Sequence, residues 1–345
     1  MATLVDIPEE LIPLQGFLAE GMGLVEARMQ RQLASDLPPV QRLCKHVERY
    51  HGKMIRPALV FLSGLAGRGE DRVPSVHDEK AVVIASVCEM VHLATLVHDD
   101  VLDEADTRRR TQTVNSLRGN EAAVILGDYL FSAAFNLCSQ LSDQRTSLRI
   151  AEVGMTLCAG ELLQLDHRED FSLDEPTYFE IVKRKTASLI GAACELGARH
   201  VGVAHDDSPA RLERFGMALG VAFQIQDDLL DLTGDQAVVG KSLGKDLEKG
   251  KLTLPIIHHL ASAEVTQRGR TLAILADATG ERFGDAHARG GLLRAALEQT
   301  GSIDHARGVA EGLVREAREA IAPLKETPAK RMLSLMADAV VRRSW

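Results

Sequence analysis

The stretch His98-Asp99-Asp100-Val101-Leu102-Asp103 ends a long apolar segment, and Gln226-Asp227-Asp228-Leu229-Leu230-Asp231 repeats its pattern in a second apolar segment. On an α-helix, residues three and four positions apart share a face. Asp99 and Asp103 therefore point the same way with Asp100 one step round, and the second stretch repeats this geometry. Carboxylates so close together repel one another unless a cation lies among them. These two stretches, the first and second aspartate motifs, are thus candidate cation sites.

A hard, oxygen-seeking cation such as Mg2+ suits these motifs, because it binds one or two carboxylates and completes its octahedron with water and phosphate oxygens. The candidate ligands are the six aspartates of the motifs: Asp99, Asp100, Asp103, Asp227, Asp228 and Asp231. The alternative is that each motif is solvated acidic surface. Two copies in apolar, helix-type sequence, each followed by basic residues, favour the metal site.

The composition around the motifs favours helix, because Ala and Leu are abundant, aromatic residues make up only 4%, and Val-rich alternating runs are scarce. Apolar residues recur at helical spacing in thirteen segments, with 104–118 predicted as a loop and 233–250 as an ordered loop or lid. We expect one all-α domain over residues 1–345, a bundle of long helices. The predicted helices run over about 9–33, 40–50, 58–66, 78–103, 119–141, 145–168, 175–203, 208–232, 254–263, 266–277, 289–299, 303–321 and 328–343.

Charge and cysteine usage limit the class of protein. The net charge of −9 disfavours a general nucleic-acid binder, and an anionic substrate would need local basic groups and metal. Five cysteines without a CxxC pair indicate reduced thiols: Cys44, Cys88, Cys138, Cys158 and Cys194. The N-terminal residues lack a signal-peptide pattern, and charges interrupt the apolar runs before a bilayer span is reached. We expect a cytoplasmic protein with no membrane span.

Basic residues follow both aspartate motifs and also lie at two other places in the sequence. Any one of these groups is ordinarily a solvated face. Combined with metal-binding carboxylates, they predict a diphosphate site, because the cations can bind phosphate oxygens that the metals leave uncovered. There are more basic groups than one diphosphate needs, so we expect two diphosphates. The groups are Lys53 and Arg56; Arg108, Arg109 and Arg110; Lys183, Arg184 and Lys185; and Lys241, Lys245, Lys249 and Lys251. His92 and Gln224 lie on the aspartate-bearing faces, although His92 is equally consistent with a packed core histidine.

These residues resemble the trans-isoprenyl diphosphate synthase (polyprenyl synthetase) family, from about Val40 to Gly250. The matching elements are Gly52-Lys53-Met54-Ile55-Arg56-Pro57, His92 to Asp103, Asp106-Thr107-Arg108-Arg109, Gly127-Asp128-Tyr129-Leu130, Gly160-Glu161 with Gln164, Lys185-Thr186-Ala187, Phe223 to Asp231, Gly240-Lys241, Asp246 and Lys251. His51, Met54 and Arg110 depart from the family's usual residues, which affects expected substrate affinity rather than the ligand set. The resemblance implies helices around a deep central cavity, with the motifs facing each other at its mouth.

The resemblance also implies roles for the site residues. Asp99, Asp103 and Asp227 would be the principal ligands of about three Mg2+ ions, and Asp100, Asp228 and Asp231 would support them directly or through water. Basic residues would bind the substrates: Arg108, Lys185 and Lys241 the allylic diphosphate, and Lys53, Arg56, His92 and Arg109 isopentenyl diphosphate, with Lys251 nearby. Thr186 and Gln224 would stabilise the allylic cation by their dipoles, and 233–250 would exclude water.

The resemblance also implies that the helical turn before Asp99 determines the length of the product. Relatives with short products carry an aromatic residue there. This chain has Val91, Ala94 and Thr95 there. Small side chains leave room that a phenyl ring would fill, so we expect a long polyprenyl diphosphate rather than a geranylgeranyl or farnesyl product. The alternative is that these residues only allow close helix packing and that Phe131 sets the length.

Three other classes compete with this interpretation. A terpene cyclase of the same fold would not need Lys53, Arg56 and Arg109. An HD-type phosphohydrolase, suggested by His98-Asp99, would need further His ligands. A helical scaffold or inactive synthase subunit would be expected to have lost aspartates or arginines. The family resemblance further implies a homodimer, and the lipid product suggests transient contact with a membrane surface.

Overall fold

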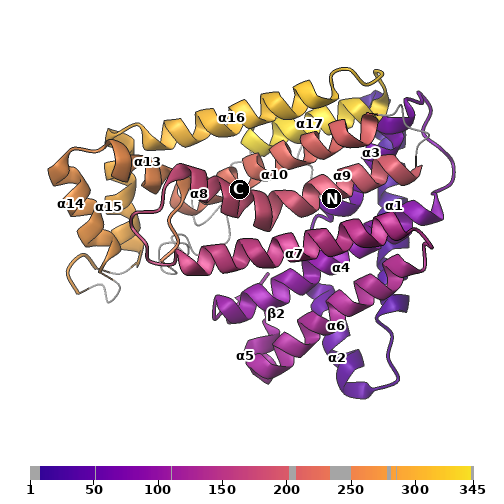
Figure 1. Ribbon diagram of the computed structural model, residues 1–345, viewed down its shortest axis with the longest axis horizontal. Helices are drawn as coiled ribbons and strands as arrows, with labels where there is room; N and C mark the ends of the chain where they lie inside the picture. The colour runs from indigo at the N-terminus through magenta and orange to yellow at the C-terminus, as the bar shows by residue number, and fades with distance from the viewer. Residues whose placement is uncertain are drawn as a thin grey trace. The chain divides into compact units, whose positions relative to one another are not determined.

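The computed structural model describes residues 8–50, 52–109, 111–201, 207–233, 250–277, 281–284 and 286–342. Most of them lie in helices, which confirms the predicted all-α class (Figure 1). The helices are η1 (Glu9–Leu11), α1 (Ile12–Gln32), α2 (Pro38–Val47), η2 (Glu48–Tyr50), α3 (Ile55–Arg68), α4 (Glu79–Leu102), α5 (Val114–Arg118), α6 (Asn120–Ser139), α7 (Gln144–Asp166), α8 (Glu175–Val182), η3 (Lys183–Ala187), α9 (Ser188–Val201), α10 (Ser208–Thr233), α13 (Leu254–Ser262), α14 (Val265–Leu275), α15 (Ala286–Gln299), α16 (Ser302–Ile321) and α17 (Pro328–Arg342).

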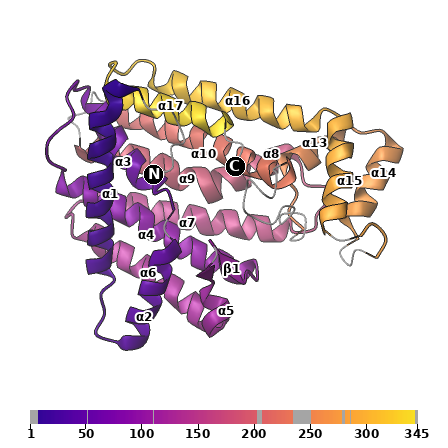
Figure 2. The ribbon, with the colours of Figure 1, turned by 180° about the vertical axis from the view of Figure 1, so that it is seen from behind.

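The predicted loop 104–118 is partly wrong. It contains the only strands of the described residues, β1 (Thr107–Arg108) and β2 (Thr111–Gln112), which pair antiparallel, followed by the short helix α5. In Figure 2, β1 lies next to α5. Strands of two residues are too short to show a period in the sequence, so the pattern did not reveal them. Of the segment 233–250, predicted as a lid, residues 234–249 lie outside the described part of the chain.

The chain divides into two compact units. Unit 1 comprises Met1–Met155, Leu189–Gly216 and Ala320–Leu335, and unit 2 comprises Thr156–Ser188, Met217–Glu319 and Met336–Trp345. The first aspartate motif belongs to unit 1 and the second to unit 2. The expectation of a single domain stays a prediction.

Helix α4 is the core helix of unit 1. Its N-cap Asp78 accepts hydrogen bonds from the backbone N–H groups of Lys80 and Ala81, which would otherwise lack partners. From Ala81 to Leu93 the helix is buried at almost every position, and it packs against α1, α3 and α6. A helix that is apolar all round is expected at the centre of a core. The last turn of α4 carries the first aspartate motif, so a rigid element positions it.

Helices α4 and α6 are long and apolar enough to cross a membrane. The apolar window of α4 is 78% buried, as in the core helix of a globular protein, and that of α6 is 39% buried. The absence of a membrane span stays a prediction.

Unit 2 has its own apolar core. Buried side chains from α8, α10, α13, α15 and α16 form it, among them Val182, Ile225, Ile257 and Leu293. Tyr178 on α8 is also buried in this core, where its ring meets Phe179 edge to face. The core therefore holds α8 and the C-terminal half of α10, which carries the second aspartate motif.

Candidate active site

Burial divides the aspartates of both motifs in the same way. Asp100 and Asp228, the second aspartate of each motif, are only 1% and 4% exposed. The other four are half-buried and reach solvent: Asp99, Asp103, Asp227 and Asp231. In the first motif these carboxylates lie at the C-terminus of α4, where the helix dipole is also negative. The C-terminal end of α4 therefore attracts cations strongly.

Asp100 is bound by a cation of its own chain. Both Nε and Nη2 of Arg108 approach Asp100 Oδ1 to 2.8 Å. The β1–β2 hairpin carries Arg108 back towards α4, and His46 on α2 anchors the hairpin through Gln112 O at 2.7 Å. The Asp100 charge also contributes to raising the pKa of buried Tyr50 to about 12, behind burial itself. Asp100 thus binds Arg108 and the hairpin, and its role towards a metal stays a prediction.

Arg109 lies against the Lys53 segment. Its Nη1 donates to the carbonyl of Tyr50, and its guanidinium packs on Gly52. A Cβ at residue 52 would lie 2.2 Å from Nη2 of Arg109, so any side chain there would displace the guanidinium. The structure therefore brings together Arg109 and the segment of Lys53, two of the residues predicted to hold isopentenyl diphosphate.

Arg56, in the first turn of α3, shares its surroundings with Arg109 and with Glu89 of α4. Burial lowers the pKa of Arg56, the negative charge of Glu89 opposes this, and Arg109 lowers it further. Burial likewise lowers the pKa of Arg109, and Glu89 again opposes. Glu89 is 2% exposed and lies one turn before His92. Sequence reasoning missed Glu89, although a charged residue inside an apolar helix was the available signal.

The second motif is bound by neutral donors. The Tyr178 hydroxyl donates to Asp228 Oδ2 at 2.7 Å, and Gln224 Nε2 donates to Asp228 Oδ1 at 2.8 Å. Gln224 Oε1 in turn accepts from the Thr186 hydroxyl at 3.0 Å. The predicted residues Thr186, Gln224 and Asp228 are therefore one connected network. Tyr178 was missed, because it is fifty positions from Asp228 in the sequence and only the fold brings them together.

A π-helical turn, η3, lets both Tyr178 and Thr186 reach α10. In a regular α-helix two residues eight positions apart differ by about 80° in direction. The π-turn Lys183–Ala187 takes up one extra residue and reduces this difference to about 20°. Ala187 consequently packs on Gly220 of α10, where a Cβ would lie 2.6 Å from Ala187 Cα. Such turns occur frequently at functional sites.

Lys185 in the same turn is bound by two residues of α7. Its Nζ forms an ion pair with Glu161 and donates to Gln164 Oε1 at 2.8 Å. Both partners belong to family-like elements of the sequence. Lys251 is half-buried beside Gly250, whose carbonyl accepts from the backbone N–H of Glu169. Lys241 lies outside the described residues.

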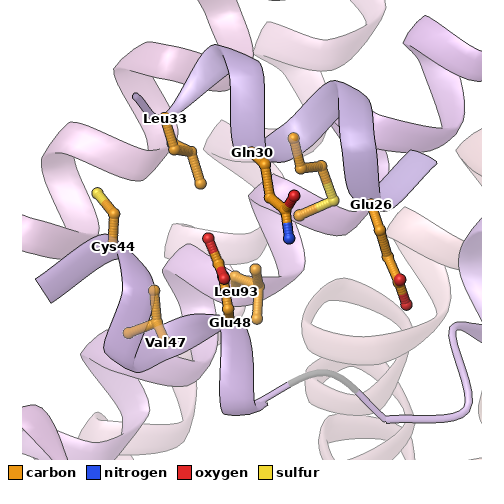
Figure 3. A pocket seen from close by; sticks show the side chains of 8 residues that line it. Glu26, Gln30, Leu33, Cys44, Val47, Glu48 and Leu93 are labelled. Atoms are coloured by element: carbon orange, nitrogen blue, oxygen red, sulfur yellow. The ribbon is translucent and has the colours of Figure 1, made fainter. Parts of the chain in front are cut away.

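Of the residues predicted to set product length, Val91 and Ala94 are buried in unit 1 and Thr95 is half-buried. Val91 and Ala94 are fully buried, and the Thr95 hydroxyl donates to the carbonyl of His92 at 2.8 Å. Their neighbour Leu93 points elsewhere, into a cavity of about 210 Å³ between α1, α2 and α4 (Figure 3). The cavity is lined by Glu26, Met29, Gln30, Leu33, Cys44, Val47, Glu48 and Leu93. The role of Val91, Ala94 and Thr95 stays a prediction.

Comparisons with known proteins place the chain in a family. Residues 38–286 match the model of the polyprenyl synthetase family. The octaprenyl diphosphate synthase of Escherichia coli is 33% identical and covers 94% of this chain and 96% of its own. Heptaprenyl diphosphate synthase component 2 of Geobacillus stearothermophilus is 35% identical (74% and 78%), and a short chain isoprenyl diphosphate synthase of Methanothermobacter thermautotrophicus is 32% identical (91% and 94%).

A solved structure agrees with these matches. The polyprenyl synthase of Caulobacter crescentus, complexed with calcium and isoprenyl diphosphate, is 28% identical, covers 98% of both chains and superposes with a TM-score of 0.85. The matches confirm the family and the enzyme class predicted from the two motifs, a trans-prenyltransferase, and they point to dependence on a divalent metal. The chain belongs to the polyprenyl synthetase family.

Proposed function

We propose that this enzyme condenses isopentenyl diphosphate head-to-tail with an allylic diphosphate and extends the chain to a long polyprenyl diphosphate. The observation that carries this proposal is the shared construction of the two motifs. Each presents two half-buried aspartates to solvent and buries the aspartate between them, and each is followed in the sequence by basic residues suited to diphosphate.

The metal in this proposal is Mg2+, in about three ions. The donor set fits, because the accessible ligands are carboxylate oxygens, which Mg2+ prefers. Among the described residues no three His, Cys, Asp or Glu side chains are arranged to hold a metal by themselves. Mg2+ commonly combines one or two carboxylates with water and substrate phosphates. Bound Mg2+ would neutralise the charge that develops on the departing diphosphate.

The side chains of the chain itself then act on the two substrates. Arg108, Lys185 and Lys241 bind the allylic diphosphate, whose C–O bond breaks with the electron pair leaving on the diphosphate. The double bond of isopentenyl diphosphate, held by Lys53, Arg56, His92 and Arg109, attacks the allylic cation. A new C–C bond forms, and a proton passes from the added unit to the released diphosphate. Thr186 and Gln224 turn their oxygens towards the cation.

The long product is supported by the small side chains at Ala94 and Thr95 and by the names of two relatives, which make octaprenyl and heptaprenyl diphosphates. The short-chain relative carries the opposite implication, so chain length is the property to measure first. Because the Geobacillus relative is named as one component, the assay is run on this chain alone. Condensation by the single chain would mean that no second subunit is required.

The proposal includes a homodimer in the cytoplasm, with product release at a membrane surface. Exposed apolar residues on α6 and α7 support the dimer: Ile125 is 66%, Leu148 59% and Met155 75% exposed. Exposed apolar surface of this kind typically marks an interface. Ile125→Glu with Met155→Glu should convert a dimer to a monomer in light scattering, whereas Val76→Glu, at another exposed position, should not. A monomeric wild-type chain would contradict the dimer.

The deciding experiment incubates the purified chain with isopentenyl diphosphate, farnesyl diphosphate and Mg2+, and measures released diphosphate and product length. Asp99→Asn and Asp227→Asn should each lower the rate by about 100-fold or more, because a carboxylate ligand is lost. Asp304→Asn, at an exposed position on α16, is the matched control and should keep full activity. Release of diphosphate from farnesyl diphosphate without any condensation would instead indicate a cyclase.

A further inference from the structure

Three hydrogen bonds connect Tyr178 to Thr186 through side chains of α10. The Tyr178 hydroxyl donates to Asp228 Oδ2, Gln224 Nε2 donates to Asp228 Oδ1, and the Thr186 hydroxyl donates to Gln224 Oε1. The distances are 2.7, 2.8 and 3.0 Å. Tyr178 and Asp228 are each 4% exposed, so water does not compete for these bonds.

The direction of every bond in this network follows from Asp228. Both carboxyl oxygens of Asp228 accept hydrogen bonds, and Gln224 turns its NH2 group towards Oδ1. The amide oxygen of Gln224 then faces Thr186 and can only accept, which commits the hydroxyl proton of Thr186 to Gln224. Because the proton of the Thr186 hydroxyl is used in this way, the lone pairs of Oγ1 remain available to a neighbouring electron-poor group.

We infer that Tyr178 is a positioning residue, whose hydroxyl holds Asp228 so that Gln224 and Thr186 present oxygen lone pairs to the reacting allyl group. This inference rests on the proposed function and adds a residue that neither aspartate motif contains. Tyr178 acts through Asp228 and is not itself in contact with substrate.

The position of Tyr178 suits this role. Its ring is fixed in the unit 2 core and against Phe179, so the hydroxyl has little freedom to move away from Asp228. The π-turn aligns it with Thr186 on the side that faces α10. A hydrogen bond from a fixed donor to a buried charged acceptor is among the stronger ones in proteins. Loss of the hydroxyl would remove one of the bonds that orient Asp228 and, through it, Gln224.

The test removes one oxygen atom. Tyr178→Phe should lower the rate constant of a single condensation by about tenfold and leave KM for isopentenyl diphosphate within about twofold of wild type, because Lys53 and Arg56 take no part in the three bonds of the network. In a Thr186→Val background the same change should cost less than about threefold, since the end of the network is already missing. Tyr129→Phe, the same chemical change at a half-buried position on α6, is the matched control.

Replacement of Tyr178 by p-aminophenylalanine, which keeps a donor at the same place, should restore the rate to within about threefold of wild type. p-Methylphenylalanine has similar size without a donor and should not. If Tyr178→Phe unfolds at a lower temperature than wild type, the rates of these two analogues are compared with each other instead. An unchanged rate in Tyr178→Phe, an equal loss in both backgrounds, or equal rates for the two analogues would overturn the inference.

The same variants distinguish failure of this inference from failure of the proposed function. A wild-type chain that condenses nothing rejects the function only. The network is then tested by urea unfolding of Tyr178→Phe, Thr186→Val and the double variant. Non-additive changes in the free energy of unfolding are expected from a connected network. Additive changes would overturn it.

Discussion

Arg108 binds a single oxygen of Asp100 with two of its nitrogens, Nε and Nη2, at 2.8 Å each. Only the planar guanidinium can approach one acceptor in this way from a fixed hairpin. Asp100 is almost completely buried, so it requires a partner of opposite charge, and the pair fixes the hairpin that also carries Arg109. The hairpin therefore holds Arg108 and Arg109 in a fixed position relative to the first motif.

Arg108→Lys is expected to lower kcat/KM for the allylic diphosphate by about 30-fold, because lysine keeps the charge and loses the two-nitrogen contact. Steady-state kinetics with farnesyl diphosphate measures this loss. Arg118→Lys, at an exposed position on α5, should change kcat/KM by less than twofold. Equal effects of the two substitutions would show that Arg108 contributes only charge.

Gly52→Ala is expected to raise KM for isopentenyl diphosphate by about tenfold while the melting temperature stays within a few degrees. The new Cβ would overlap the Arg109 guanidinium, and the flexible Arg109 side chain rather than the backbone would move. Gly23→Ala is the control, because a Cβ at Gly23 meets nothing within 4 Å. If Gly52→Ala leaves KM unchanged, Arg109 does not hold this substrate.

Ala94→Phe is expected to shorten the product, as read by chromatography of the dephosphorylated alcohols. Ala94 is fully buried, so the larger ring should also cost about 1–3 kcal/mol of stability by overpacking. The adjacent Leu93→Phe should leave the product length unchanged, because Leu93 points into the separate cavity of Figure 3. An unaltered length in a folded Ala94→Phe protein would reject Ala94 as the floor, and Phe131→Ala would then be the variant to examine.

Cys158 is expected to be the one thiol that reacts quickly with Ellman's reagent in the native chain. It is exposed, whereas the other four cysteines are buried. Burial raises the pKa of Cys44 to about 11 and of Cys88 and Cys194 to about 12, so these thiols carry almost no thiolate at neutral pH. Cys158→Ser should abolish the fast phase and Cys44→Ser should preserve it. Condensation should continue in both variants, because no cysteine belongs to the proposed site.

The free energy of unfolding is expected to fall as the pH is lowered from 7.5 to 5.5. Burial lowers the pKa of His259, whose ring nitrogens both bond to threonines, Thr300 and Thr271, at 2.9 Å. Near pH 6.5 the unfolded chain then binds a proton that the folded chain does not bind. The contribution of His259 to the free energy of unfolding is therefore fully present above that pH and is lost as the pH falls below it. Urea midpoints at the two pH values measure the slope.

His259→Gln should reduce this pH dependence, even though the variant is less stable at every pH. His167→Gln, at a half-buried position of unit 2 without the two threonine bonds, is the control and should retain the slope. A wild-type chain that is equally stable at both pH values would contradict the prediction.

The helices and the aspartate motifs could be predicted from the sequence, because helical periodicity and a run of acidic residues are local signals. The segment predicted over 78–103 is α4 (Glu79–Leu102), and 208–232 is α10 (Ser208–Thr233). The partners of the motifs could not be predicted in the same way. The Tyr178–Asp228 bond joins residues that are distant in sequence, and helical spacing places Asp100 one step round from Asp99 and Asp103 without showing that it is buried.

The remaining misses have equally physical reasons. The hairpin 107–112 is too short for a period, and the π-turn at Lys183–Ala187 leaves no mark in composition, because it differs from an α-turn only in how many residues it holds. Glu89 was missed because a single charge in an apolar helix does not reveal which distant residues it faces, here Arg56 and Arg109.

The π-turn has a consequence for how this segment tolerates change. Side-chain replacements between Tyr178 and Thr186 change the surface of the helix, but Tyr178 and Thr186 still point towards α10. Insertion of one further residue would instead turn Tyr178 by about 100° relative to Thr186, whereas loss of the extra residue would leave an ordinary helix with the two side chains still within about 20° of each other. The shared direction of Tyr178 and Thr186, more than the identity of the residues between them, is therefore what this part of the molecule must preserve.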